Sequence, residues 1–263
     1  MKINTRIAHI VPVSHLEQTQ NNSYHMSLAH LVGQSETYRN FYRRMSDEGK
    51  FVIMDNGCAE NAQLDVDSLI VAAEQLKPTE LVLPDTLYDG ASTFAKSTIA
   101  LERFNNSLSF KPRYMAVPQG HTVEEWFESA VQLLTLSVQT IGVSKFLPII
   151  TKDPDSRLKA VALLDRYLNE HEELHNIEIH LLGCDEGPAK MHEIFIRSPY
   201  VRGCDSAFAF IAAQAGIMID RLTLRPEGEI DFLNGNVSKT MLDVAMLNFD
   251  STAGVRDNTG VWC

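Results

Sequence analysis

The sequence lacks the features that mark secreted and membrane-spanning proteins. Its four cysteines, Cys58, Cys184, Cys204 and Cys263, are widely spaced and form no Cys-x-x-Cys pair, which argues against a disulfide framework and a structural zinc site. No stretch approaches the roughly 18 consecutive apolar residues that a membrane span needs, and the N-terminus lacks the apolar core of a signal peptide. We therefore expect a soluble cytoplasmic protein with reduced thiols and no membrane partner.

Positive charge is also scarce. The chain has 23 Lys and Arg residues against 34 Asp and Glu residues, which gives a formal net charge of -11. Because phosphate neutralisation usually draws on clustered Lys and Arg, this balance argues against a protein that binds nucleic acid over its whole surface. The charge balance does not exclude a local basic strip. A homodimer, and an accessory protein that supplies positive charge, also stay open. The arginines available for such a strip are Arg39, Arg43, Arg44, Arg197, Arg202, Arg221 and Arg225.

Long linkers and low-complexity segments are absent, and a chain of 263 residues suits one (β/α)8 barrel, which typically needs about 250 residues. Short apolar, β-branched runs alternate with longer stretches of helical periodicity at intervals of roughly 30 residues, as βα units require. We predict an α/β fold, a single-domain TIM-type (β/α)8 barrel over residues 1–263, with irregular segments at about 14–50 and 222–263. The predicted strands are residues 7–13, 51–55, 80–84, 113–118, 140–144, 177–182 and 201–207, with a further strand near 230–233.

Helices are predicted between these strands from their periodicity. Thr122 is expected to cap one helix, with Glu125 three residues later completing a reciprocal capping box that satisfies two backbone N–H groups. The predicted helices are residues 67–76, 91–104, 123–136, 155–172 and 189–197.

Polar residues and glycines mark the carboxyl ends of the predicted strands, where the active sites of (β/α)8 enzymes lie. An Asp after a strand is often only the N-cap of the next helix. Asp185 fits that structural role best, because the Glu186-Gly187-Pro188 segment after it can form a simple turn. The residues at these ends are Asp55, Asp85, Asp185, Asp205, Gln119 and Gly142.

Such a set of carboxylates suits recognition and exchange of a purine-like base. An aspartate can accept hydrogen bonds from the N1–H group and the exocyclic amine of a guanine edge, while Gln and backbone N–H groups satisfy the carbonyl side. Double displacement at a glycosidic carbon needs two further carboxylates, one as nucleophile and one as acid and base.

In their order along the chain, the strand ends over roughly residues 50–210 resemble those of the tRNA-guanine transglycosylase superfamily. The Met54-Asp55-Asn56-Gly57-Cys58 segment is similar to the Asp-Ser-Gly-Gly type turn of that family, and the resemblance implies that Asp55 is the general acid and base. Asp205, in Arg202-Gly203-Cys204-Asp205-Ser206, resembles the family's nucleophile. The resemblance therefore implies Asp205 and Asp55 as the catalytic residues.

The same resemblance implies a set of base-binding residues. Asp85 follows a strand as in the family, Gln119 lies in a segment like its Val-Gln-Gly turn, and Gly142 lies in one like its Gly-x-x-Val-Gly segment. The His180-Leu181-Leu182-Gly183 segment resembles the family's His-Leu-hydrophobic-Gly strand. The base-binding residues implied are Asp85, Gln119, Gly142, Gly183 and Asn56.

The chain departs from the tRNA enzymes in two respects. It is shorter, and it lacks their Cys-x-Cys-x-x-Cys…His zinc subdomain, since only Cys263 lies downstream of Cys204. It is more similar to the compact phage and bacterial DNA-guanine transglycosylases. That resemblance implies exchange of guanine in DNA for a 7-deazaguanine, such as 7-cyano-7-deazaguanine, in the host cytoplasm if the chain is phage-encoded. DNA and the 7-deazaguanine co-substrate are then the partners, and no metal or other cofactor is required.

Other functions stay open on the sequence alone. One is exchange in tRNA, a second is a barrel lyase or aldolase whose Asp55, Asp85 and Asp205 hold a divalent metal, and a third is a non-catalytic accessory barrel that binds 7-deazaguanine. A base that is exchanged must leave the stack of its helix, and the aromatic residues Tyr88, Phe208 and Phe210 are candidates to stack on it. His9 and His15 are expected to be structural.

Overall fold

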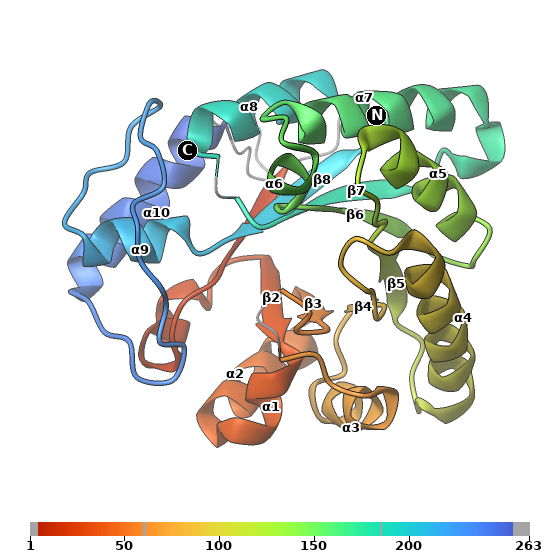
Figure 1. Ribbon diagram of the computed structural model, residues 1–263. Coiled ribbons are helices and arrows are strands. Elements are labelled where there is room, and N and C mark those ends of the chain that lie inside the picture. The colour runs from red at the N-terminus through yellow and green to blue at the C-terminus, as the bar shows by residue number, and fades with distance from the viewer. Residues whose placement is uncertain (1–4, 60–61, 185, 255–263) are drawn as a thin grey trace. The chain divides into compact units, whose positions relative to one another are not determined.

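The computed structural model describes residues 5–59, 62–184 and 186–254 of the chain. Eight strands form one sheet in the order β1-β8-β7-β6-β5-β4-β3-β2, and helices alternate with strands along the chain (Figure 1). This confirms the predicted fold class, a (β/α)8 barrel. The strands are β1 (Arg6–His9), β2 (Tyr24–Leu28), β3 (Phe51–Asp55), β4 (Glu80–Val82), β5 (Arg113–Ala116), β6 (Thr140–Ser144), β7 (Glu178–Leu182) and β8 (Val201–Ser206).

Most helices follow a strand and lie close to their predicted positions. The α-helices are α1 (Ala29–Gln34), α2 (Glu36–Asp47), α3 (Val66–Leu76), α4 (Gly90–Ser107), α5 (Val123–Leu133), α6 (Leu147–Thr151), α7 (Ser156–Glu170), α8 (Pro188–Arg197), α9 (Phe208–Gln214) and α10 (Lys239–Ala253). Two 3-10 helices, η1 (Val13–Thr19) and η2 (Glu172–Leu174), complete the described elements.

The chain divides into two compact units, and its predicted extent as one domain over residues 1–263 stays a prediction. The first unit comprises Met1–Met26 and Leu181–Cys263. Within it, β1 pairs with β8 in parallel, with Arg6 opposite Gly203. A Cβ atom on Gly203 would lie 2.1 Å from the Arg6 carbonyl oxygen, so this pairing requires glycine. Helix α10 packs against α9 (Figure 1) and α8.

The second unit comprises Ser27–His180. In it β3, β4, β5 and β6 pair in parallel in chain order. The strand interiors are apolar and buried on both faces, which is typical of parallel sheets covered by helices. Helix α4 packs against α5, and α5 packs against α7 (Figure 1).

The predicted strand at residues 230–233 is wrong. Asp231 begins a turn there, because its Oδ1 accepts the N–H groups of Leu233 and Asn234 at 3.1 and 2.9 Å. The further strand is β2, inside the 14–50 segment that was expected to be irregular. Its sequence, Tyr-His-Met-Ser-Leu, contains no β-branched aliphatic residue, so the strand signal is weak although all its residues are buried.

The same segment also contains η1, α1 and α2, and α10 lies in the segment 222–263. Helix α2 buries Tyr38, Phe41, Tyr42 and Met45, whose spacing of three and four residues is a helical stripe. Charged residues between these positions obscured the pattern. The expectation of irregular structure is therefore wrong for both segments.

The predicted capping box at α5 is correct in one half. Thr122 Oγ1 accepts the N–H of Glu125 at 3.1 Å, as expected of an N-cap. The Glu125 carboxylate, however, accepts the N–H of His121 at 2.7 Å, one residue before the predicted donor. The side chain therefore holds the connection before α5 as well as the helix itself.

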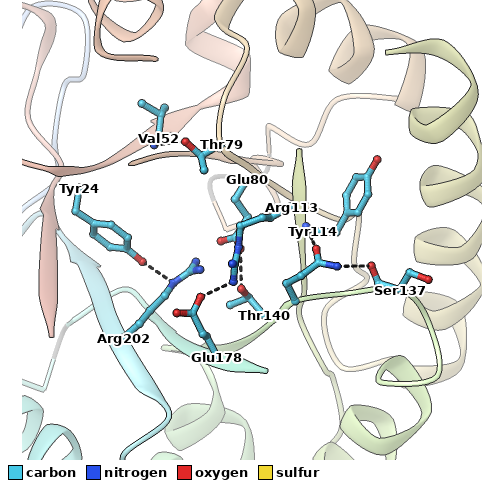
Figure 2. Close-up of polar contacts among 11 residues, drawn as sticks. Tyr24, Val52, Thr79, Glu80, Arg113, Tyr114, Ser137, Thr140, Glu178 and Arg202 are labelled. Atoms are coloured by element: carbon cyan, nitrogen blue, oxygen red, sulfur yellow. Dashed lines mark hydrogen bonds and ion pairs between the residues drawn. The ribbon is translucent and has the colours of Figure 1, made fainter. Parts of the chain in front are cut away.

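Polar side chains in the second unit meet at the amino ends of its strands (Figure 2). Glu80 begins β4 and is fully buried. Its Oε1 accepts the hydroxyl of Thr140 at 2.6 Å and lies 3.4 Å from Nε of Arg113. The Arg113 guanidinium also pairs with Glu178 at the start of β7. A buried carboxylate is costly unless it is paired and hydrogen-bonded, so this network holds the beginnings of neighbouring strands in register.

We expect Glu80→Ala to lower the free energy of unfolding by about 3 kcal/mol, because truncation leaves the Thr140 hydroxyl and part of the Arg113 charge without their acceptor. Urea unfolding followed by circular dichroism measures the change. Asp47→Ala, which removes the exposed ion pair with Arg43, is the control and should cost less than about 1 kcal/mol. Equal losses in the two variants would show that the buried network does not contribute more than a surface pair.

Candidate functional site

A buried cluster of polar side chains lies after strands β3, β4 and β5 in the second unit. Asp85 is 4% exposed. Its Oδ1 accepts a hydrogen bond from Nδ2 of Asn56 at 2.9 Å, and its Oδ2 accepts one from Nε2 of Gln119 at 2.7 Å. Three of the residues predicted to bind a base are therefore in direct contact.

Each amide in this cluster is fixed at both ends. Asn56 Nδ2 also donates to the Leu83 carbonyl at 2.8 Å, and its Oδ1 accepts the N–H of Cys58 at 2.8 Å. Gln119 Oε1 accepts the N–H of Tyr88 at 3.2 Å. The donors that face Asp85 are thus pre-oriented, and they are neutral.

Burial raises the pKa of Asp85, and the hydrogen bonds from Asn56, Cys58 and Gln119 oppose that shift. The cause is the loss of hydration of the carboxylate, which neutral amides offset only in part. Carboxylates with perturbed pKa values are enriched at functional sites. Asp85 is not the N-cap of α4, because that cap is Asp89, whose side chain accepts a hydrogen bond from the N–H of Ser92.

Two neighbours of Asp85 were not assigned a role from the sequence. Gln63 Nε2 donates to the Asp85 carbonyl at 3.0 Å. Cys58 is half-buried, and desolvation, followed by the nearby Asp85 charge, raises the pKa of its thiol to about 12. A thiol with that pKa is protonated near neutral pH, so Cys58 is a poor nucleophile.

Asp55 ends β3, as predicted for the general acid and base. Its Oδ2 accepts the N–H of Gly57 at 2.9 Å, an Asx turn that orients the carboxylate at the strand end. Gly57 has a φ of 80°, and a Cβ atom there would lie 2.8 Å from the Ala62 carbonyl oxygen. The turn after Asp55 therefore requires glycine.

The predicted nucleophile Asp205 lies in β8 of the first unit, where it is buried. Its Oδ1 accepts the N–H of Gly183 at 3.0 Å. Gly183 has a φ of 67°, a backbone conformation that other residues rarely adopt. The structure thus joins two of the predicted site residues, one a carboxylate and the other a backbone donor.

The remaining candidates have varied positions. Gly142 is buried inside β6, and Asp185 lies outside the described residues. Phe208 and Phe210 are both buried, so they are core residues and not the stacking aromatics that were considered. Tyr88 is the exposed member of that group, at 46%.

His9 and His15, which were expected to be structural, both form side-chain hydrogen bonds. His9 Nε2 contacts Asp250 Oδ1 at 2.8 Å on α10, and His15 contacts Gln18 and Asn236. Both histidines are buried. They hold the beginning of the chain to the region of α10.

Arg202 does not belong to a basic surface strip. It is fully buried near the start of β8, where its Nε donates to the Tyr24 hydroxyl at 3.0 Å (Figure 2). Polar residues at the amino ends of barrel strands usually serve stability. Any phosphate contact must therefore come from other cations.

Within the described ranges, no group of three or more His, Cys, Asp and Glu residues is arranged to hold a metal ion. The cysteines described, Cys58, Cys184 and Cys204, are free thiols, and Cys263 lies outside those ranges. The described helices also include none that is both long and apolar enough to cross a membrane.

Comparison with known protein families finds no family model that matches this chain, and comparison with curated proteins finds no match either.

The raised pKa of Asp85 predicts a pH-dependent contribution to stability. The unfolded chain loses this proton near pH 3.8, whereas the folded protein keeps it to higher pH. The stabilisation is therefore complete below about pH 3.8 and is lost as the pH rises through the folded-state pKa. We expect the free energy of unfolding of the wild type, relative to Asp85→Asn, to fall as the pH is raised from about 4 to 7.

Urea unfolding at several pH values in that range measures the difference. Asp65→Asn is the control, because a backbone hydrogen bond from Ser68 lowers the pKa of this exposed helix cap. Its contribution is present above pH 3.8 and lost only as the pH falls through the lowered pKa. The same decline in both comparisons, or no decline for Asp85, would contradict the argument.

Proposed function

We propose that this protein is a DNA-guanine transglycosylase, which exchanges guanine in DNA for a 7-deazaguanine base through a covalent intermediate on an aspartate. The observation that carries the proposal is the buried Asp85 carboxylate, whose oxygens are held by the neutral amides of Asn56 and Gln119. The order of residues at the strand ends, which resembles that of the tRNA-guanine transglycosylase superfamily, supports it.

The Asp85 cluster suits a guanine-type edge better than other bases. Each carboxylate oxygen has a second lone pair beyond the one that an amide occupies, so Asp85 can accept from both N1–H and the exocyclic amine. An adenine edge would present an acceptor, N1, to the same carboxylate, which is repulsive. Gln119 keeps one further N–H donor for the carbonyl side of the base. A 7-deazaguanine has the same edge, so both bases use one pocket in turn.

In the first half-reaction an Asp205 oxygen attacks C1′ of the target deoxyguanosine. The bond between C1′ and N9 breaks, its electron pair stays with the guanine, and Asp55 in its acid form protonates the leaving base. Asp205 is then joined to the sugar by an ester bond. The N–H of Gly183 on Asp205 Oδ1 orients the carboxylate for this attack, because one of its oxygens is held by a fixed donor.

In the second half-reaction the 7-deazaguanine takes the place of guanine. Its N9 attacks C1′ and loses its proton to the Asp55 carboxylate, while the ester bond to Asp205 breaks. Two displacements at one carbon retain its configuration. The proton that Asp55 gave in the first step is thereby restored.

The decisive experiment incubates the purified protein with guanine-containing DNA, a matched tRNA and 7-cyano-7-deazaguanine, and measures modified nucleosides by mass spectrometry. We expect the deazaguanine nucleoside in DNA only. Asp205→Ala should lower its rate of formation by about a thousandfold or more, since a covalent nucleophile has no substitute. Asp55→Asn should lower it by about 100-fold to 10,000-fold, as loss of a general acid and base does.

The matched control is Asp220→Asn, which changes an exposed aspartate in a surface turn of the first unit and should leave the exchange rate unchanged. Wild-type protein with DNA, denatured in the absence of 7-cyano-7-deazaguanine, should also retain a covalent DNA adduct that Asp205→Ala lacks. Modified tRNA alone would move the activity to that nucleic acid. No product in either substrate would reject the transglycosylase and favour an accessory base-binding protein or different chemistry.

A further inference from the structure

An exposed pair of stacked rings lies beside the Asp85 cluster. Tyr88, in the connection before α4, and His121, in the connection before α5, have ring centroids 6.0 Å apart and an interplanar angle of 12°. Both side chains are exposed, Tyr88 at 46%. An exposed aromatic ring offers a flat apolar face on which another ring can stack.

Tyr88 has an unusual backbone. Its φ is 71°, in the left-handed region that is rare and costly for a bulky residue. This conformation accompanies the hydrogen bond of the Tyr88 N–H to Oε1 of Gln119, at 3.2 Å. One residue therefore both fixes the predicted base-binding amide and presents a ring to solvent directly next to it.

Grooves of different charge flank the stacked pair. A groove of about 480 Å³ is lined by both rings and by Asp89, Glu125 and Glu128, which repel phosphate. A second groove of about 470 Å³, between α5 and α7, is lined by His121, Lys159 and Arg166. Lys159 is paired with Asp153, and Glu124 also lines this groove, so its charge is mixed. A strand of DNA that leaves the rings is favoured on the α7 side, where Arg166 is exposed.

We propose that Tyr88 and His121 form a stacking surface for the base of a nucleotide adjacent to the one that is exchanged, in single-stranded or locally opened DNA. The proposal rests on the proposed function in taking DNA as the substrate. Stacking on an aromatic ring needs no sequence-specific hydrogen bonds and tolerates every base. It also explains how an acidic protein holds DNA, because part of the affinity comes from rings rather than from phosphate contacts.

The test measures binding of a fluorescein-labelled single-stranded DNA oligonucleotide that contains one guanine, by fluorescence anisotropy and without any deazaguanine. We expect Tyr88→Asn and His121→Ala each to raise the dissociation constant about 10-fold. Asn is chosen because it tolerates a left-handed backbone. Tyr88→Phe, which keeps the ring, should bind like the wild type.

Another Tyr–His stack provides a matched control. Tyr167 and His171, on and just after α7, have ring centroids 4.0 Å apart, and they lie in neither groove beside Tyr88. Tyr167→Asn and His171→Ala should leave DNA affinity unchanged. Any general effect of losing such a stack would appear in these variants as well.

Oligonucleotides with an abasic site next to the guanine, on its 5′ or its 3′ side, identify the stacked base. The wild type should bind one of them about 10-fold more weakly than the intact strand, and Tyr88→Asn should bind both alike. The stacking surface would be rejected if neither abasic site and neither ring variant changed the dissociation constant. It would also be rejected if the protein did not bind DNA. DNA binding can be measured without base exchange, so the two proposals can fail separately. Base exchange in DNA without any effect of the ring variants on binding would reject the stacking surface alone. Weaker DNA binding by the ring variants without base exchange would reject only the transglycosylase.

Discussion

The strands of this protein are buried on both faces, and this constraint determines where its polar chemistry can lie. Interior positions of β3, β4, β5 and β6 are apolar, because an unpaired polar group buried there costs several kcal/mol. Charged and amide side chains therefore gather at the two ends of the strands. In the second unit Glu80, Arg113 and Thr140 meet at the amino ends, whereas Asn56, Asp85 and Gln119 meet beyond the carboxyl ends.

The buried carboxylates at the two ends of the strands have different hydrogen-bond partners. Glu80 is close to the Arg113 guanidinium and accepts the Thr140 hydroxyl, so its charge has a partner within the protein. Asp85 is held by the neutral side chains of Asn56, Gln119 and Cys58, and its pKa is raised. A carboxylate held by neutral groups can still accept strong hydrogen bonds from a ligand that brings further donors. A carboxylate that is already paired with a cation has less capacity to do so.

The sequence is most informative where burial alone determines the structure. The β-branched run at β3 and the helical stripes of α3 and α7 were predicted within a few residues, because local periodicity reports burial directly. β2 was missed because His25 and Ser27 are buried by tertiary packing that no local pattern shows. Arg202, which was considered for a basic strip, is buried for the same reason. Asp85 and Gln119 were predicted by resemblance, but their contact and the roles of Gln63 and Tyr88 depend on loops whose course the sequence does not reveal.

The hydrogen bonds of Gln119 connect the proposed base-binding carboxylate to the proposed stacking surface. Its Nε2 donates to Asp85 and its Oε1 accepts from the N–H of Tyr88. If the amide were flipped, its oxygen would face the Asp85 carboxylate and its NH2 group would face the Tyr88 N–H. Both bonds would be lost at once, which makes the observed orientation strongly preferred. A base that stacks on Tyr88 steadies the connection that supplies this N–H, and a base that binds Asp85 draws on the amide that the N–H orients. Each ligand is thus expected to favour the backbone arrangement that the other requires.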